Sequence, residues 1–105
     1  MGESLAVIAM FYVVPIAGGP SVSNIVARAV EVVKKRGHKY MVTPASTIFE
    51  AASVREALET IAEAIEEVKR CEGVLRVIAE IKLDERLDKP LSMESMVESV
   101  REKLA

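Results

Sequence analysis

Hydrophobic and polar positions along the chain alternate between strand-like and helix-like patterns. Residues 5–14 are apolar at almost every position and rich in β-branched and aromatic side chains, which predicts a strand covered on both faces. Residues 40–50 predict a hairpin of two short strands around a Pro-Ala-Ser turn. Residues 74–83 have one purely apolar face and one face rich in charge, which predicts a further strand.

Stripes of apolar residues at helical spacing predict three helices. The first is capped by Ser21 or Ser23 and runs to about Arg36, where Gly37 stops it, with basic residues in its last turn. The second opens with Ser53 and a glutamate three residues later, the signature of a capping box, and runs to about residue 70. The third is capped by Ser92 and continues to the end of the chain.

The predicted order is β-α-β-β-α-β followed by a C-terminal helix, within one domain of residues 1–105. This is the α+β, ferredoxin-like arrangement, an antiparallel sheet with helices on one face and the first and third strands at its centre. Alternation places Ser46, Ile48 and Glu50 on one sheet face, and Thr47 on the other. We expect Glu50 to share the helix-free face with residues 76, 78 and 80. The first strand also needs cover on that face, which a second subunit can supply.

The composition and net charge narrow the classes of function that this protein can have. Half of the 105 residues are hydrophobic, 29% are charged and the net charge is −2, a globular balance that gives no electrostatic case for nucleic acid or an anionic membrane. The apolar run at residues 5–17 is shorter than the ~20 residues of a membrane-spanning helix. Cys71 is the only cysteine, which favours a reducing compartment over a disulfide framework. Glutamine is absent and Asn24 is the only asparagine, a bias typical of thermophiles that a short chain can also show by chance.

Candidate catalytic and metal-binding groups are sparse. The loop at residues 18–21 opens a helix, so it is either an anion site or an ordinary glycine-rich turn with a serine cap. His38 is the only histidine and follows Gly37, so we expect an exposed turn residue and no metal site. No serine or cysteine has an identifiable base, and the glutamates of the second predicted helix are spaced as a solvated face. We therefore expect no catalysis.

Glu50 lies inside an apolar strand, where a charged carboxylate needs a partner. Three interpretations remain open from the residues alone. It pairs across the sheet with Arg76 or Arg86, it is exposed at a strand end, or it binds a ligand beside Thr43, Ser46 and Thr47.

Three segments resemble the thiamine-binding family of small ferredoxin-like proteins. They are Val14-Pro15 followed by Gly-Gly-Pro-Ser21-Val-Ser23, then Tyr40-x-x-Thr43-Pro44-x-x-Thr47-x-x-Glu50, and finally Lys82-x-Asp84-x-Arg86-x-Asp88-Lys89. The resemblance covers nearly the whole chain.

The resemblance implies a cytoplasmic homodimer or homotetramer that binds thiamine or its hydroxymethylpyrimidine moiety without converting it, and that needs no cofactor. It carries over six ligand contacts: Glu50, Thr47, Thr43, Ser21, Ser23 and, as a stacking surface, Tyr40. The alternative is a regulatory or structural oligomerisation module without a small ligand, suggested by the apolar second face of the first strand.

Overall fold

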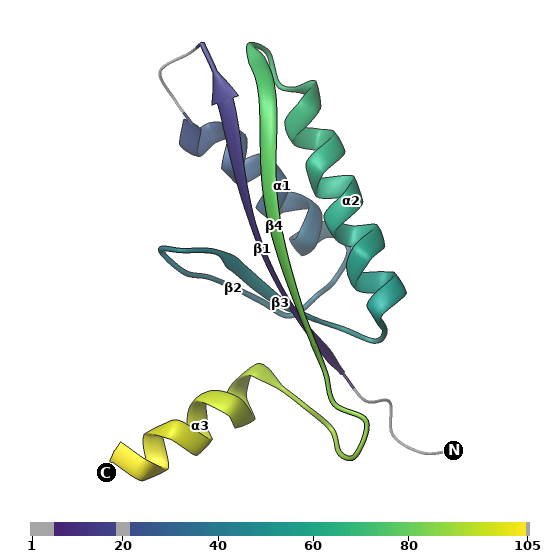
Figure 1. Cartoon of the computed structure of the whole chain (residues 1–105), viewed down its shortest axis with the longest axis vertical. Coiled ribbons are helices and arrows are strands. Elements are labelled where there is room, and N and C mark those ends of the chain that lie inside the picture. Colours follow the sequence, from purple (N-terminus) through teal and green to yellow (C-terminus); the bar gives the residue numbers. More distant parts are fainter. Residues whose placement is uncertain (1–5, 19–21, 105) are drawn as a thin grey trace.

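The computed structural model describes residues 6–18 and 22–104, which form a four-stranded antiparallel sheet and three helices (Figure 1). The elements are β1 (Val7–Ala17), α1 (Val22–Lys35), β2 (Tyr40–Val42), β3 (Thr47–Ala51), α2 (Val54–Arg70), β4 (Val74–Glu85) and α3 (Met93–Leu104). The strand order β2-β3-β1-β4 places the first and third strands at the centre. The predicted α+β, ferredoxin-like fold is confirmed.

The two long strands extend beyond the rest of the sheet. β1 pairs with β3 only from Val7 to Phe11, but it pairs with β4 from Val7 to Ala17. The outer halves of β1 and β4 therefore form a two-stranded ribbon (Figure 1). Pro15 is tolerated in this ribbon because β1 has a neighbouring strand on one side only.

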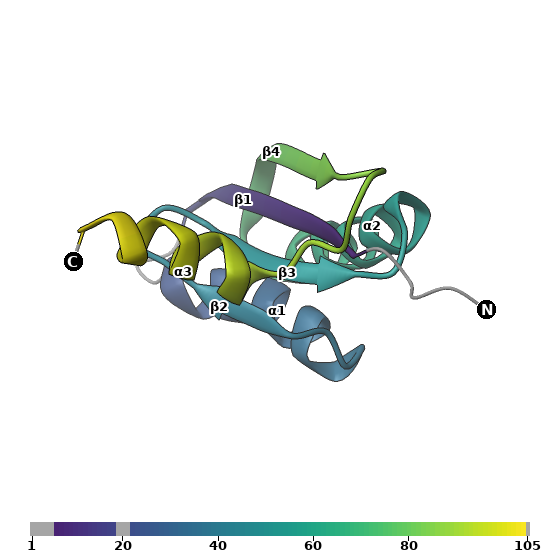
Figure 2. The same ribbon diagram turned by 90° about the horizontal axis from the view of Figure 1, so that it is seen from below.

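The core lies between one face of the sheet and helices α1 and α2 (Figure 2). Phe11 and Phe49 from the two central strands meet edge to face, with their ring centroids 6.0 Å apart. Val33 of α1 and Ile61 of α2 are among the most deeply buried side chains opposite them. Burial alternates along β3, because the helices cover only one face of the sheet. Thr47, Phe49 and Ala51 are buried, whereas Ile48 and Glu50 on the other face are half-buried.

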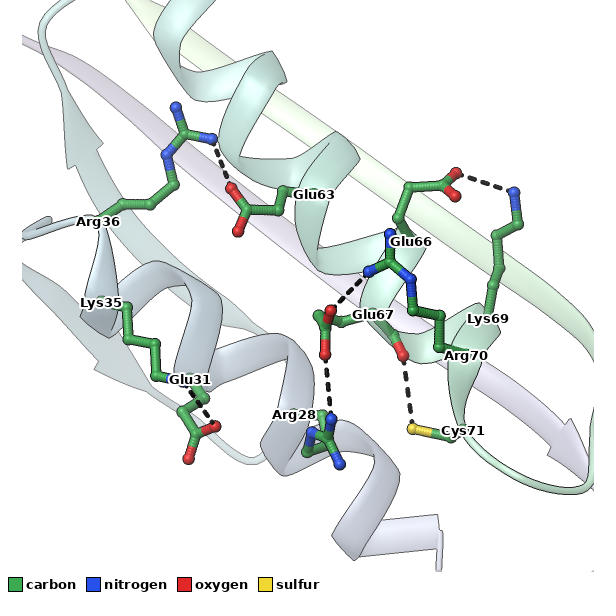
Figure 3. Close-up of polar contacts among 10 residues, drawn as sticks. All are labelled: Arg28, Glu31, Lys35, Arg36, Glu63, Glu66, Glu67, Lys69, Arg70 and Cys71. Atoms are coloured by element: carbon green, nitrogen blue, oxygen red, sulfur yellow. Dashed lines mark hydrogen bonds and ion pairs between the residues drawn. The ribbon is translucent and has the colours of Figure 1, made fainter.

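Ion pairs join the two helices on their outer surface (Figure 3). Arg28 of α1 lies 3.1 Å from the Glu67 carboxylate of α2, which also binds Arg70 of its own helix at 2.6 Å. Hydrogen bonds from these guanidinium groups, that of Arg28 first, hold the pKa of Glu67 below its usual value. Arg36 and Glu63 form a second link between the helices at 2.9 Å.

His38 is not the exposed turn residue that we expected. Its side chain is only 5% exposed, and its ring lies 4.7 Å from that of Phe49. Nδ1 is 2.8 Å from the Glu50 carbonyl oxygen, and Nε2 is 2.7 Å from the Thr60 hydroxyl. Gly37, at φ +83°, turns the chain back after α1, so that the histidine enters the space between sheet and helix instead of facing solvent.

Candidate functional site

A cleft of about 280 Å³ opens between α1, the turn joining β2 to β3, and the outer half of β1. It exists because β3 begins at Thr47, so that β1 has no neighbouring strand on the β3 side beyond Phe11, while α1 still spans this region. Most of its walls are apolar: Phe11, Val13, Pro15, Val22, Val26, Ala29, Val30 and Val42. The polar side chains in the wall come mainly from the turn, namely Thr43, Ser46 and Thr47.

The Thr43 hydroxyl builds the turn at the cleft edge. It accepts hydrogen bonds from the backbone N–H groups of Ala45 at 3.2 Å and Ser46 at 3.0 Å. It also donates to the Ser46 carbonyl oxygen at 3.0 Å. A hydroxyl has one donor and two acceptor sites. Thr43 therefore shapes the cleft, but its own hydrogen-bonding capacity is already used.

The Thr47 hydroxyl differs in that it makes no hydrogen bond within the described part of the protein. The residue is only 6% exposed. No fully enclosed side-chain oxygen or nitrogen lacks a partner among the described residues, so this hydroxyl must open onto the cleft that it lines. Its donor and acceptor sites are therefore open to a hydrogen bond with water or with a molecule bound in the cleft.

Glu50 lies on the opposite face of the sheet from Thr47. One carboxylate oxygen accepts a hydrogen bond of 2.8 Å from the backbone N–H of Met93, the first residue of α3. The negative charge therefore sits at the positive end of the helix dipole. This contact stabilises the start of α3 and ties it to the centre of the sheet.

The structure excludes both ion pairs that we considered for Glu50. As predicted, Glu50 shares its face with Arg76, because both residues pair with even-numbered positions of β1. However, Glu50 lies opposite Ile8 and Arg76 opposite Ile16, which are about 26 Å apart along the strand. Arg86 instead binds Asp88 through two nitrogens, at 2.7 and 3.0 Å.

Tyr40 lines a second cleft, of about 250 Å³, between β2 and α3. Met41, Met93, Val97 and Arg101 form other parts of its wall. Lys39 and Glu94 form an ion pair at this cleft, and their hydrogen bond raises the pKa of Lys39 and lowers that of Glu94. This cleft adjoins Glu50, because Met93 belongs to both environments.

The six residues predicted to contact the ligand therefore do not all lie in one cleft. Thr43 and Thr47 line the first cleft, whereas Tyr40 and Glu50 lie near α3. Ser23 is exposed in the first turn of α1 and lines neither cleft, and Ser21 is outside the described residues.

Sequence reasoning missed the wall supplied by α1. The apolar stripe predicted only that a helix forms there, whereas in the structure Val26 and Val30 are half-buried and face the first cleft.

Two classes of site find no support in residues 6–18 and 22–104. No group of three or more histidine, cysteine, aspartate or glutamate side chains there could hold a metal ion. Within the same ranges, every helix is too short or too polar to cross a membrane.

Comparison with known proteins identifies relatives along most of the chain. The sequence profile described as thiamine-binding protein matches residues 9–101. A UPF0045 protein of Methanothermobacter thermautotrophicus is 37% identical over 80% of this chain and 84% of its own length. The crystal structure of the hypothetical protein MJ1052 of Methanocaldococcus jannaschii superposes with a TM-score of 0.82, at 33% identity, over 92% of this chain and 97% of that one.

A more distant structure shares the fold. It is a putative thiamine biosynthesis/salvage protein of Thermotoga maritima, 21% identical with a TM-score of 0.77, over 91% of this chain and 99% of that one. Because the family profile spans nearly the whole domain and the relatives match along most of their length, the chain belongs to the thiamine-binding protein family.

Proposed function

We propose that the protein binds thiamine or its hydroxymethylpyrimidine moiety in the cleft beneath α1, without converting it, as a cytoplasmic homo-oligomer. Family membership supports the ligand class. The observation that carries the choice of cleft is the Thr47 hydroxyl, which is nearly buried, opens onto an otherwise apolar wall and has no partner in the described protein.

The wall chemistry suits an aminopyrimidine. Such a ring has two apolar faces, which side chains such as Val26 and Val30 can cover, and an edge that carries hydrogen-bond donors and acceptors. Thr47 can pair with this edge, and Ser46 lies beside it. The volume of about 280 Å³ is near the lower limit of small-molecule sites, about 300 Å³, which favours a small heteroaromatic ligand.

The same wall supports binding without turnover. Among the described residues that line the cleft, only Tyr12 has an ionisable side chain. Proton transfer at a reacting group needs a positioned acid or base within hydrogen-bonding reach. The Thr47 hydroxyl has no such group beside it, so its role in this proposal is to bind.

Calorimetric titration with thiamine and with hydroxymethylpyrimidine tests the proposal. Thr47→Val keeps the shape of the side chain and removes the hydroxyl, so we expect affinity to fall by the worth of one hydrogen bond, about 0.5–1.5 kcal/mol or roughly 2- to 13-fold. Thr47→Ser, which keeps the hydroxyl, is the matched control. Val26→Phe should fill the cleft and abolish binding. The absence of both heat and thermal stabilisation at millimolar ligand would refute the proposal.

Glu50 and Tyr40 offer a different location for the same ligand, in the cleft beside α3. A ligand bound there predicts that Glu50→Gln weakens binding by more than tenfold, over ~1.4 kcal/mol, and that Thr47→Val has no effect. Binding beneath α1 predicts the reverse. The two variants together therefore assign the site.

A function in assembly alone is the second candidate. It is favoured by large apolar side chains that remain exposed on β1 and β4, including Tyr12, Ile16 and Ile78. Both candidates predict self-association. They differ in the titration, because an assembly module should bind neither ligand.

A further inference from the structure

His38 is a buried ionisable group that the proposed function does not use. Its side chain is 5% exposed, and each ring nitrogen lies against an oxygen atom of the protein. Nδ1 is 2.8 Å from the Glu50 carbonyl oxygen, and Nε2 is 2.7 Å from the Thr60 hydroxyl. Histidine is the side chain whose charge ordinarily changes between about pH 5 and pH 8. The groups around the ring therefore decide whether it takes up a proton while the protein stays folded.

The Thr60 hydroxyl has one proton and two neighbours that could receive it. These are Nε2 of His38 and, at 3.0 Å, the Glu56 carbonyl oxygen. If the ring is neutral, the hydroxyl donates to Nε2 and its bond to Glu56 is lost. If the ring is charged, Nε2–H donates to the hydroxyl, which then donates to Glu56. A carbonyl oxygen only accepts, so Nδ1 donates to Glu50 in both states. Only the charged ring satisfies all three contacts at once.

We propose that His38 is a proton-dependent switch whose charged form fastens the end of β3 to the first turns of α2. The proton comes from solvent and binds Nε2, and the Thr60 hydroxyl turns from Nε2 to the Glu56 carbonyl oxygen. In the charged form the bond from Nδ1 to Glu50 is charge-assisted, and such bonds are roughly twice as strong as neutral ones. The inference is independent of the ligand and of the assembly of subunits.

A carboxylate is placed to offset the charge of the protonated ring. Oε1 of Glu56 lies 3.6 Å from Nδ1, a distance at which an opposite charge favours the charged form. The same oxygen accepts a hydrogen bond of 3.4 Å from the Ala52 N–H, which holds it beside the ring. The other charged groups on the surrounding segments are engaged elsewhere: Glu50 with the Met93 N–H, Arg36 with Glu63, and Lys39 with Glu94.

These partners distinguish His38 from a histidine that is buried among apolar groups. Such a histidine opposes folding once it is charged, because nothing offsets the cost of burying the charge. His38 has an oxygen acceptor at each nitrogen and a carboxylate beside the ring. We therefore expect the folded protein to take up this proton without unfolding.

NMR of the nitrogen-labelled protein tests the switch directly, because His38 is the only histidine of the chain. At about pH 8 we expect a neutral ring with its proton on Nδ1, and at about pH 5 a ring protonated at both nitrogens. The backbone amide spectrum should be that of the folded protein at both pH values. A neutral ring with its proton on Nε2 would overturn the assignment of donors. A ring that becomes charged only as the protein unfolds would overturn the switch.

Substitution of Glu56 tests the compensating charge. Glu56→Gln keeps the size of the side chain and an acceptor oxygen but removes the charge. The affinity of the folded ring for its proton should fall by about tenfold, the lower end for an opposite charge at this distance, because the Glu56 side chain is 43% exposed. Glu66→Gln, which removes an exposed α2 carboxylate paired with Lys69, is the matched control and should leave the titration midpoint unchanged.

Substitution of Thr60 tests the acceptor at Nε2. Thr60→Val leaves the N–H of the charged ring without an acceptor and should also lower the midpoint, whereas Thr60→Ser keeps a hydroxyl and should not. Equal midpoints in the wild type, Glu56→Gln and Thr60→Val would overturn the switch, even if every variant stays folded.

Discussion

Replacing Glu50 by alanine should release α3 from the sheet while the rest of the domain stays folded. The helix depends on few contacts, because Met93 is its only buried residue among those described. The main polar tie is the hydrogen bond from the Met93 N–H to the Glu50 carboxylate. An exposed ion pair between Lys39 and Glu94 adds a second tie, which solvent screens.

The expected size of the effect follows from this geometry. A hydrogen bond of 2.8 Å to a charged acceptor contributes about 1.5–3 kcal/mol. Its loss should raise the equilibrium constant for opening of α3 by roughly 10- to 150-fold. Glu50→Gln keeps an acceptor oxygen and loses the charge, so its effect should be smaller, about 0.5–1.5 kcal/mol.

Hydrogen exchange measured by mass spectrometry resolves this opening. Peptides from residues 93–104 should exchange faster in Glu50→Ala, whereas peptides from residues 54–70 should keep their protection. Glu59→Gln, an exposed carboxylate on α2, is the matched control and should leave both regions unchanged. Unchanged exchange of residues 93–104 in Glu50→Ala would show that the carboxylate does not anchor α3, and would refute the reasoning.

Further predictions concern the core, the ion pairs and the turns. Thr60→Val removes the hydroxyl partner of the buried His38 Nε2 and should lower the free energy of unfolding by about 1–3 kcal/mol in urea denaturation; a change below ~0.5 kcal/mol would contradict that role. Arg28 and Arg70 lower the pKa of Glu67, so the ionised Glu67 carboxylate stabilises the folded protein. This contribution to folding stability is complete above the usual carboxyl pKa range and is lost as pH falls through the lowered pKa. The Tm of Glu67→Gln should therefore fall less than that of the wild type between neutral pH and about pH 3, and parallel curves would argue against this linkage. Gly73→Ala should lower the free energy of unfolding by roughly 1–2 kcal/mol, because φ is +84° at this position and a residue with a Cβ atom is strained there. The Tm of this variant should therefore be lower than that of the wild type.

Local signals were sufficient for the order of the elements. The predicted Ser53 cap of α2 forms, with the Ser53 side chain accepting from the Glu56 N–H at 3.1 Å, whereas the Glu56 carboxylate accepts from the Ala52 N–H, one residue before the cap, at 3.4 Å. Such signals involve neighbouring residues, so the sequence contains both partners. The position of His38 could not be predicted in this way, because Thr60 and Phe49, which enclose it, come from other elements.

Periodicity and local capping were sufficient to predict which elements form and which residues share a sheet face. Periodicity already separated Thr47 from Glu50, because three positions along a strand change the face. The groups that each face meets depend instead on how the elements pack together. Because β3 begins only at Thr47, a cleft is left there, and the chain after β4 returns to place the first residue of α3 on Glu50. Both features depend on where segments that are far apart in the sequence lie in the fold. Strand length and packing across the whole domain set these positions.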